Sequence, residues 1–370
     1  MTFEATQGAA AWRSADLQTD QRWIFSIDDK GRRHLEQSVR RAFDPARDLF
    51  DYRRSDFDFE PVLPVIRAAL EEAKTGRGVA LIRGLPREDL TEDEFKVMSW
   101  ALGLYMGVPR PQGKASQYMS AVRNVGTDYR SSTGRGYSSN AELDFHTDSA
   151  DVVALSCYNQ AVSGGMSMVT SSVAAYAVMR DTFPNLVELL HEPVHFSRQG
   201  EQAADEAASY PHPIFDFANG RIFSRWNRNR VTAAQKLEGV PRIRERQQQA
   251  LLQFDELLRR PDLMYTMFLK PGDVQLLNSH VNLHARTDFV DHEEPEKRRL
   301  LFRLWLATPD SVRLPESWRV QYRSVEPGAV RGGIFGHYYD RACIDFDTRQ
   351  AADLGMKVAH SVPASAAAVQ

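Results

Sequence analysis

Apolar residues recur three and four positions apart in several stretches of the chain, a spacing that places them on one face of a helix. Most of these stretches begin at a cap residue or end at glycine. The sequence Thr-Glu-Asp-Glu at 91–94 is a capping box and marks one helix start. The pattern therefore predicts helices at 60–78, 91–105, 171–179, 185–190 and 243–258.

Short apolar or alternating runs bounded by glycine, proline or asparagine predict strands. The residues before about position 21 show neither pattern and read as a loose lead-in. An Asn219-Gly220 pair between two of the runs predicts a hairpin turn. The predicted strands cover 23–27, 79–82, 145–148, 152–157, 214–217, 221–226, 274–277 and 299–306.

Helices early in the chain and in a mid-chain insertion, with strands around them, favour an α+β fold. Together with a candidate metal-binding pair on one strand, this order indicates a double-stranded β-helix, a jelly-roll relative, with flanking and inserted helices. A length of 370 residues suits one large domain, and no internal repeat suggests a division. We expect a single domain over 1–370, with its core at about 60–345 and flexible ends.

Composition narrows the class of partner. The apolar fraction of 42% and charged fraction of 26% are ordinary for a globular protein. A net charge of −3 argues against binding to nucleic acid or to an anionic membrane, either of which needs a concentrated basic face. A small molecule is the expected partner, and a homo-oligomer is left open.

The two cysteines, Cys157 and Cys343, provide no disulfide framework and no cysteine zinc cluster. Both are expected to be core residues. The chain starts without a basic and apolar leader and contains no long apolar run. We therefore expect a cytoplasmic protein.

The stretch Phe145-His146-Thr147-Asp148 carries the strongest chemical signal. On an extended strand His146 and Asp148 point to the same side. A second imidazole, available downstream at His284, would complete the two-histidine, one-carboxylate set that binds iron(II) and leaves other positions open. His280 could instead act beside the metal or replace a ligand, whereas structural roles are the better interpretation for two further histidines, His191 and His195.

Arginines at 299 and 303 lie four apart in a strand that is otherwise apolar, so they share a face with Leu301. A buried guanidinium is unfavourable unless a carboxylate matches its fork. The sequence therefore predicts a buried acid beside Arg299 or Arg303, supplied by the protein or by a bound dicarboxylate. Ser167, after a double glycine, could add a hydroxyl to the same carboxylate.

The irregular polar stretch from 107 to 140 is either a lid over the site or ordinary surface. Its side chains of interest are Gln117, Tyr118, Ser139 and Asn140. Farther on, Arg225, Arg228 and Arg230 could meet an acidic substrate, although arginines at a hairpin end are more often solvated or paired. Tyr118, Asn140 and Arg225 join Arg303 as candidate substrate residues.

The order of these motifs resembles the TauD/TfdA family, the taurine and chlorophenoxyacetate dioxygenases that use iron(II) and 2-oxoglutarate. The resemblance covers about residues 60–310 and rests on the HxD triplet, the glycine pair before Ser167, the late histidine and the arginine strand. An isolated HxD triplet would be weak evidence. The order and spacing of all four motifs together make the resemblance strong.

The resemblance implies iron ligation by His146, Asp148 and His284, and 2-oxoglutarate binding by Arg299 with Ser167, where the family usually has threonine. Arg298 is the alternative anchor, and Arg303 would meet an acidic group of the substrate. With O2 as the third reactant, the implied reaction hydroxylates or desaturates a small organic molecule and releases succinate and CO2.

Two other classes of protein could use the same residues. A zinc hydrolase could activate water on the same triad, but it would have no use for a dicarboxylate-binding arginine. A non-catalytic jelly-roll binding protein could employ the histidines for packing alone. Binding of stoichiometric metal and of 2-oxoglutarate would separate these alternatives.

Overall fold

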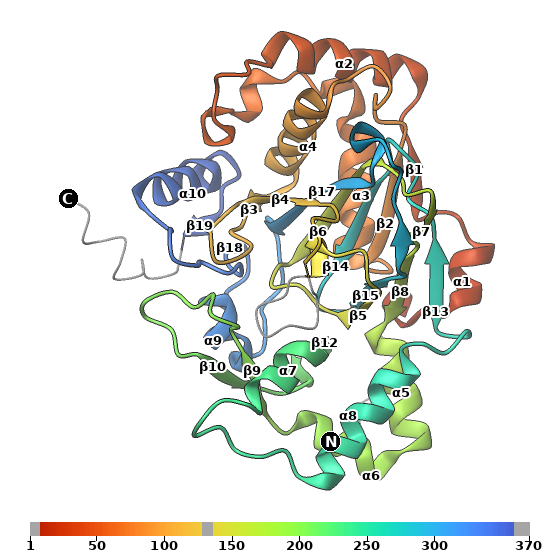
Figure 1. The fold of residues 1–370 in the computed structure, drawn as a ribbon, viewed down its shortest axis with the longest axis vertical. Helices are drawn as coiled ribbons and strands as arrows, with labels where there is room; N and C mark the ends of the chain where they lie inside the picture. The colour runs from red at the N-terminus through yellow and green to blue at the C-terminus, as the bar shows by residue number, and fades with distance from the viewer. Residues whose placement is uncertain (1–7, 128–135, 359–370) are drawn as a thin grey trace.

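The computed structural model describes residues 8–127 and 136–358, and its centre is a pair of β-sheets with helices on their outer sides (Figure 1). The larger sheet is antiparallel except where β1 pairs with β2 in parallel. Its strands run in the order β1 (Ile24–Ser26), β2 (Val79–Arg83), β14 (Val274–Asn278), β6 (Val152–Asn159), β17 (Leu300–Ala307) and β3 (Val108–Pro109), with β4 (Met119–Val122) also paired to β17.

The smaller sheet is antiparallel throughout and carries most of the chemistry described below. Its order is β13 (Met264–Met267), β8 (Ser167–Ser171), β15 (Asn282–Arg286) and β5 (Leu143–His146). Apolar residues of both sheets form one buried cluster, which includes Val153 and Leu301 from the larger sheet and Val169 from the smaller one. Two sheets packed on a shared core, with helices outside, form the predicted double-stranded β-helix.

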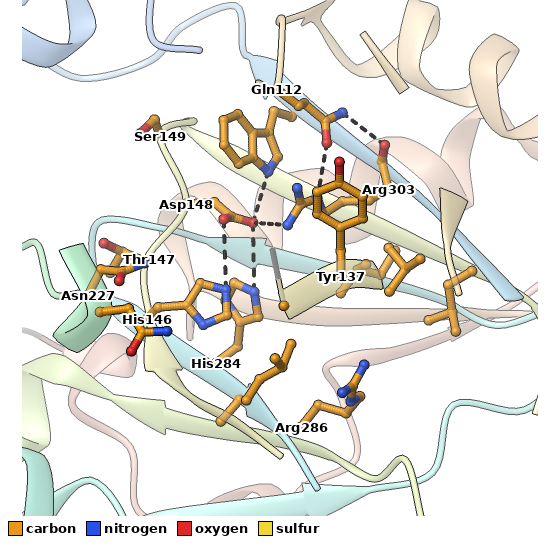
Figure 2. Close-up of a pocket in the computed structure, with 18 of the residues that line it drawn as sticks. Gln112, Tyr137, His146, Thr147, Asp148, Ser149, Asn227, His284, Arg286 and Arg303 are labelled. Carbon is orange, nitrogen blue, oxygen red and sulfur yellow. Dashed lines mark hydrogen bonds and ion pairs between the residues drawn. The ribbon is translucent and has the colours of Figure 1, made fainter. Parts of the chain in front are cut away.

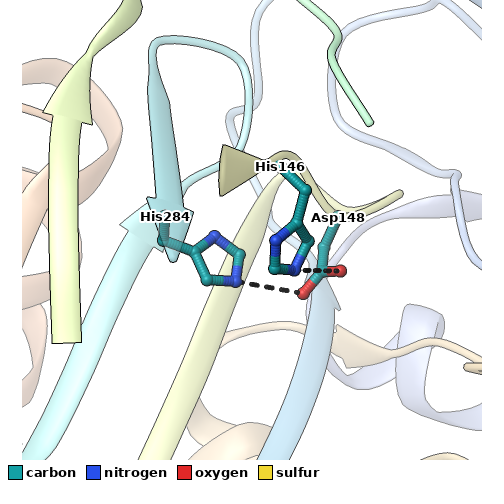
Figure 3. A group of neighbouring side chains, drawn as sticks. All are labelled: His146, Asp148 and His284. Carbon is teal, nitrogen blue, oxygen red and sulfur yellow. Dashed lines mark ion pairs between the residues drawn. The ribbon is translucent and has the colours of Figure 1, made fainter. Parts of the chain in front are cut away.

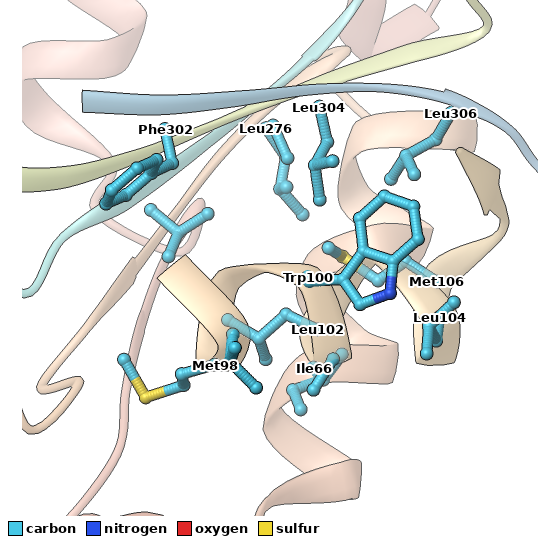
Figure 4. Close-up of a cluster of buried hydrophobic side chains, with 14 of the residues drawn as sticks. Ile66, Met98, Trp100, Leu102, Leu104, Met106, Leu276, Phe302, Leu304 and Leu306 are labelled. Carbon is cyan, nitrogen blue, oxygen red and sulfur yellow. The ribbon is translucent and has the colours of Figure 1, made fainter. Parts of the chain in front are cut away.

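Helices cover the outer face of the larger sheet (Figure 4). Strand β17 alternates: Phe302, Leu304 and Leu306 face the helices, whereas Leu301 and Trp305 face the smaller sheet. Each buried leucine contributes roughly 1.5–3 kcal/mol to stability. The helices of this side are α2 (Asp29–Ala42), α3 (Leu63–Thr75), α4 (Glu92–Met106) and α10 (Arg341–Asp353).

Helix α4 approaches β17 closely because residue 103 is glycine. A Cβ at Gly103 would lie 2.5 Å from the Cδ1 atom of Leu304. The start of α4 is the predicted capping box, in which Thr91 accepts from the amide of Glu94 and the Glu94 carboxylate accepts from the amide of Thr91. Helix α4 therefore begins and packs as its sequence requires.

An insertion between β8 and β13 covers the smaller sheet and lies at the end of the molecule opposite α2 (Figure 1). Its helices and hairpins share a core with Phe145, Leu283 and Ala285 of the smaller sheet. The insertion comprises α5 (Ser172–Thr182), α6 (Pro184–Val187), β9 (Val194–Ser197), β10 (Ser209–His212), β11 (Phe215–Ala218), β12 (Arg221–Ser224), α7 (Arg228–Ala234) and α8 (Glu245–Leu257).

The remaining short elements lie at the edges: α1 (Ser14–Thr19), α9 (Arg319–Tyr322), β7 (Ser163–Gly164), β16 (Phe289–Val290), β18 (Ala329–Val330) and β19 (Lys357–Val358). No helix in the described parts of the chain combines the length and apolar character needed to cross a membrane.

The main predicted helices and strands are confirmed, but three expectations are wrong. The lead-in is not loose from residue 8 onward, because it forms a 3-10 turn and α1, and Trp12 and Leu17 join the core between the sheets. The strand predicted to carry both His146 and Asp148 ends at His146. The hairpin strand ends at Ser224, because Asn227 caps α7.

Helices α2 and α10 had no counterpart among the predicted elements. Residues 1–7, 128–135 and 359–370, which include part of the lead-in, of the polar stretch and of the expected flexible tail, lie outside the described residues.

Candidate active site

His146 and His284 are direct cross-strand partners on β5 and β15 (Figure 3). Their ring centroids are 4.3 Å apart. Strand β5 ends at His146 because the next amide, that of Thr147, donates to the carbonyl of Trp226 in the insertion instead of continuing the sheet. The chain then turns and brings the carboxylate of Asp148 to the two imidazoles.

The three side chains converge on one point. His146 Nε2 lies 3.8 Å from Asp148 Oδ1, and His284 Nε2 lies 3.7 Å from Asp148 Oδ2. One ligand atom from each residue can be chosen so that all lie within 4.8 Å of one another. Two imidazoles and one carboxylate on one side of a point form the facial set typical of non-haem iron(II).

Neighbouring groups orient these three side chains. His146 Nδ1 lies 2.9 Å from the carbonyl oxygen of Asp144, which can only accept, so Nδ1 carries the proton and the lone pair is on Nε2. Trp305 Nε1 donates to Asp148 Oδ2 at 2.8 Å, and Arg303 Nη1 lies 3.4 Å from the same oxygen (Figure 2). The carboxylate is therefore fixed before any metal arrives.

The protonation states suit a metal. Burial alone would raise the pKa of Asp148, but Arg303, His284, His146 and the Trp305 hydrogen bond together lower it to about 2. Burial, helped by His146, lowers the pKa of His284 to about 3. At neutral pH the site thus has a carboxylate and a neutral imidazole, the forms that bind a divalent cation.

The triad lines a pocket of about 120 Å³ between the two sheets and the insertion (Figure 2). Its walls combine apolar side chains with amides and arginines. Besides the triad, the residues that line the pocket include Gln112, Val122, Tyr137, Thr147, Ser149, Leu155, Ser167, Arg225, Asn227, Arg230, Leu269, Arg286, Arg299, Leu301, Arg303, Trp305 and Ile334.

Arg299 lies in this pocket as a buried cation whose guanidinium forms no ion pair with a carboxylate of the described residues. Its side chain is 7% exposed, and Nη1 has no hydrogen-bond partner among the described residues. It packs over the ring of Phe289 and against Gly165, where a Cβ would lie 3.0 Å from Arg299 Nε. Burial lowers the pKa of Arg299 to about 10, so the guanidinium remains charged at neutral pH.

Ser167 lines the same pocket and donates to Gln275 Oε1 at 3.0 Å. Arg298, the alternative anchor, is exposed, and its guanidinium donates to the carbonyls of His292 and Glu293. Arg299, immediately before β17, thus lies in the pocket, whereas Arg298 lies at the surface.

Arg303 also lines the pocket, but its guanidinium is engaged. Nη1 contacts the Asp148 carboxylate, and Nε donates to Gln112 Oε1 at 3.0 Å. Its guanidinium carbon lies 4.9 Å from the centroid of the Trp305 ring and 5.4 Å from that of the Tyr137 ring. The acid predicted beside Arg303 is therefore Asp148, a residue of the triad.

Two candidate substrate residues from the polar stretch do not reach the pocket. The hydroxyl of Tyr118 donates to Asp347 in a buried cluster on the helical side of the larger sheet. Asn140 is exposed, and its side chain donates to the carbonyl of Phe289. Gln117 likewise lies outside the pocket, whereas Ser139 contributes a backbone carbonyl to Arg286.

The three further histidines considered from the sequence, His280, His191 and His195, have contacts outside the triad. His280 Nε2 lies 3.1 Å from Asp151, which also binds Arg331, so His280 is not a fourth member of the triad. His191 contacts the Tyr176 hydroxyl and the Phe215 carbonyl. His195 contacts Ser209.

Sequence reasoning missed Gln112, Tyr137 and Trp305 as pocket residues. A signal for Trp305 existed, because it continues the alternation that places Leu301 and Arg303 on the pocket side of β17. Gln112 gave no such signal: it reaches the pocket because Pro111 and Gln112 pair with Ile334, more than two hundred residues away.

Comparisons with known proteins agree with this geometry. The model of the family described as "Taurine catabolism dioxygenase TauD, TfdA family" matches residues 42–305. FR-33289 synthase of Streptomyces rubellomurinus is 29% identical over 314 residues, which cover 84% of this chain and 92% of that protein. The taurine hydroxylase-like protein SAT17 of Stachybotrys chartarum is 25% identical over 254 residues, 65% of this chain and 64% of that protein.

Solved structures show the same fold at low identity. An asparagine oxygenase in complex with Fe(II), hydroxyasparagine and succinate gives a TM-score of 0.58 at 16% identity, over 78% of this chain and 94% of that one. The non-haem iron oxygenase OrfP, solved with Fe and α-ketoglutaric acid, gives 0.55 at 13% identity, over 78% and 95%.

The family match spans well over half of the chain and includes the triad, Ser167 and Arg299. The chain therefore belongs to the TauD/TfdA family, and it is an iron(II)- and 2-oxoglutarate-dependent oxygenase.

Proposed function

We propose that His146, Asp148 and His284 bind the iron, that Arg299 and Ser167 bind 2-oxoglutarate, and that the enzyme oxidises a C–H bond of a small organic anion. The observation that carries this proposal is the presence, in one pocket, of a convergent triad and a buried guanidinium that no carboxylate of residues 8–127 or 136–358 pairs with. A dicarboxylate that reaches from the metal held by the triad to Arg299 would supply the carboxylate that the guanidinium lacks.

Arg299 supplies the selectivity for the co-substrate. A carboxylate beside it would replace a missing partner, because Nη1 has no acceptor among the described residues. Charged hydrogen bonds of this kind contribute about 1.5–3 kcal/mol. The hydroxyl of Ser167 can turn from Gln275 to the same carboxylate, as a serine hydroxyl rotates freely.

When bound, iron(II) with 2-oxoglutarate and O2 supplies the oxidising power, and the products include succinate and CO2. The protein's own residues hold the triad side chains in position and keep water away from the substrate. Trp305 and Arg303 hold Asp148, and the Asp144 carbonyl holds His146. Apolar walls formed by Val122, Leu155, Leu269, Leu301 and Ile334 exclude water from the substrate's reacting carbon.

An anaerobic titration tests the proposal. Purified protein receives iron(II) and then 2-oxoglutarate, and the weak visible metal-to-ligand charge-transfer band is followed. The band is expected in the wild type and in His280→Gln, a buried histidine outside the triad, but not in His284→Gln. Metal binding without the band in the wild type would contradict the proposal and favour a hydrolytic metal site.

A further inference from the structure

The pocket is rich in positive charge. Five arginines line it, at 225, 230, 286, 299 and 303, whereas Asp148 is the one acid among the described lining residues. Iron(II) would add two further positive charges. A pocket of this charge favours the binding of anions. The co-substrate 2-oxoglutarate is one such anion, and the excess of arginines leaves room for a second.

The arginines differ in what balances them. Arg303 faces Asp148, and Arg230 Nη2 donates to Glu201 at 2.9 Å. Arg299 faces no carboxylate and is the proposed co-substrate anchor. Arg225 also faces no carboxylate within the described chain: its hydrogen bonds go to the hydroxyls of Tyr210 and Ser149.

Arg225 is built into the pocket wall rather than solvated. It follows β12 in the insertion and is 3% exposed. Nε and Nη2 donate to the Tyr210 hydroxyl at 3.0 and 2.6 Å, and Nη2 lies 3.3 Å from Ser149 Oγ. A buried cation held by neutral hydroxyls lacks the partner that its burial calls for.

The two unbalanced arginines serve different parts of the pocket. Arg299 and Arg286 both pack on the ring of Phe289. In Figure 2, Arg286 lies on one side of the two imidazoles, and Ser149, Thr147 and Asn227 lie on the other. Because Arg225 contacts Ser149 and lies two positions before Asn227, it belongs to the second side.

We propose that the substrate carries an oxyanion which is seated on Arg225, across the metal site from the co-substrate anchor Arg299. This inference rests on the proposed function, which assigns Arg299 to 2-oxoglutarate. The resemblance gave the substrate's acidic group to Arg303, whose charge is already shared with Asp148. Arg225 is thus a specificity-determining residue of the insertion.

The free edge of Arg225 limits the kind of oxyanion. The side-on edge, Nε and Nη2, is occupied by Tyr210, which leaves Nη1 for a ligand. Ser149 and the carboxamides of Asn227 and Asn229 line the same pocket and add donors from other directions. Carboxylates, sulfonates and phosphonates share the required chemistry, and the three-oxygen groups use donors from several directions better than a planar carboxylate.

The test uses the full-length enzyme loaded anaerobically with iron(II) and saturating 2-oxoglutarate, so that Arg299 is occupied. Acetate, methanesulfonate and methylphosphonate are titrated at constant ionic strength, and the heat of binding is measured by calorimetry. The charge-transfer band is recorded first, so a failure of the proposed function is seen separately. We expect at least one anion to bind, and Arg225→Gln to weaken that binding about 10- to 100-fold while the band persists.

The matched control is Arg228→Gln, three residues away on α7. Arg228 is half-exposed, pairs with Asp255 and does not line the pocket, so anion binding should be unchanged. If none of the anions binds the loaded wild type, or if Arg225→Gln binds them as well as the wild type, the proposal is wrong.

Arg225 is buried, so the Arg225→Gln variant could lose the band through misfolding. In that case Tyr210→Phe decides, because it removes the hydroxyl from the Nε and Nη2 edge and allows a carboxylate to bind side-on. Acetate should then bind several-fold more tightly relative to methanesulfonate. An unchanged acetate preference would overturn the assignment.

Discussion

Two buried arginines, Arg110 and Arg299, differ in what surrounds them. Arg110 follows β3 on the helical side of the larger sheet and is fully buried, with Nη1 2.6 Å from Asp347. The hydroxyls of Tyr118 and Tyr339 donate to the same carboxylate. Arg299, 7% exposed, has no carboxylate against its guanidinium in the described chain.

The pKa values follow the partner rather than the burial. Burial alone would lower the pKa of Arg110, yet Asp347 raises it above its usual value. Burial lowers the pKa of Arg299 to about 10 because no comparable acid opposes it. A buried charge is therefore a structural feature where its counter-charge is present, and it indicates a ligand site where that counter-charge is missing.

The largest expected effect comes from the triad. Asp148→Ala removes the one carboxylate among the described residues that line the pocket, and it leaves Trp305 Nε1 and Arg303 Nη1 without their acceptor. We expect iron(II) binding and turnover to fall to background. Metal analysis after anaerobic loading, with succinate release as the activity readout, checks this expectation, and full activity would refute the ligand assignment.

Asp347→Asn tests the balanced arginine. The change leaves Arg110 as a buried cation without its counter-charge, so unfolding should become easier by about 3–5 kcal/mol. Urea denaturation of the wild type and variant measures this difference. Folded Asp347→Asn protein should bind iron(II) and 2-oxoglutarate normally, and a selective loss of 2-oxoglutarate binding would show that the two regions are not separate.

Arg299→Gln tests the unbalanced arginine and should behave in the opposite way. The dissociation constant for 2-oxoglutarate should rise about 10- to 100-fold, because a charged hydrogen bond is lost. Stability should stay the same or increase, because a buried charge without a partner is removed. Arg298→Gln, one residue earlier and exposed, is the matched control and should change neither quantity.

The smallest effect concerns one cysteine near each arginine. Burial raises the pKa of Cys157, near Arg299, and of Cys343, near Asp347, to about 12. The thiolate fraction grows only as the pH approaches 12, so neither thiol should react with a disulfide reagent at pH 8. Two thiols per chain should react after denaturation, and a fast reaction in the native protein would show that one region opens.

Features that depend on residues close together in the sequence were predictable, whereas features that depend on residues far apart in the sequence were not. Alternation in β17 and the order of the motifs led to His146, Asp148, His284 and Arg299 without the structure. Local pattern did not show that Tyr118 faces α10, because its partner Asp347 is 229 residues away. Contacts between residues so far apart in the sequence depend on tertiary packing, and a short stretch of sequence does not show them.

The same limit applies to whole elements. Helix α2 is mostly polar, and Leu35 and Val39 are among its few buried apolar residues, so it lacks the repeated apolar residues by which the other helices were predicted. The spacing of its few apolar residues on one face was a signal that could have found it. Asp148 reached the site although the strand ended before it, since Trp226 of the insertion turns the chain. Asp148 therefore lies beside the two imidazoles although the predicted strand does not extend to it.

Pairing at both ends of the chain limits how the enzyme can be trimmed or recombined. The family match starts at residue 42, after β1, and stops at 305, inside β17. A fragment cut at those limits would lose the edge strand beside β2, the Arg331 partner of Asp151 and the Ile334 wall of the pocket. Chimaeras of such enzymes should therefore exchange the internal segment between β8 and β13 and keep both flanks from one parent.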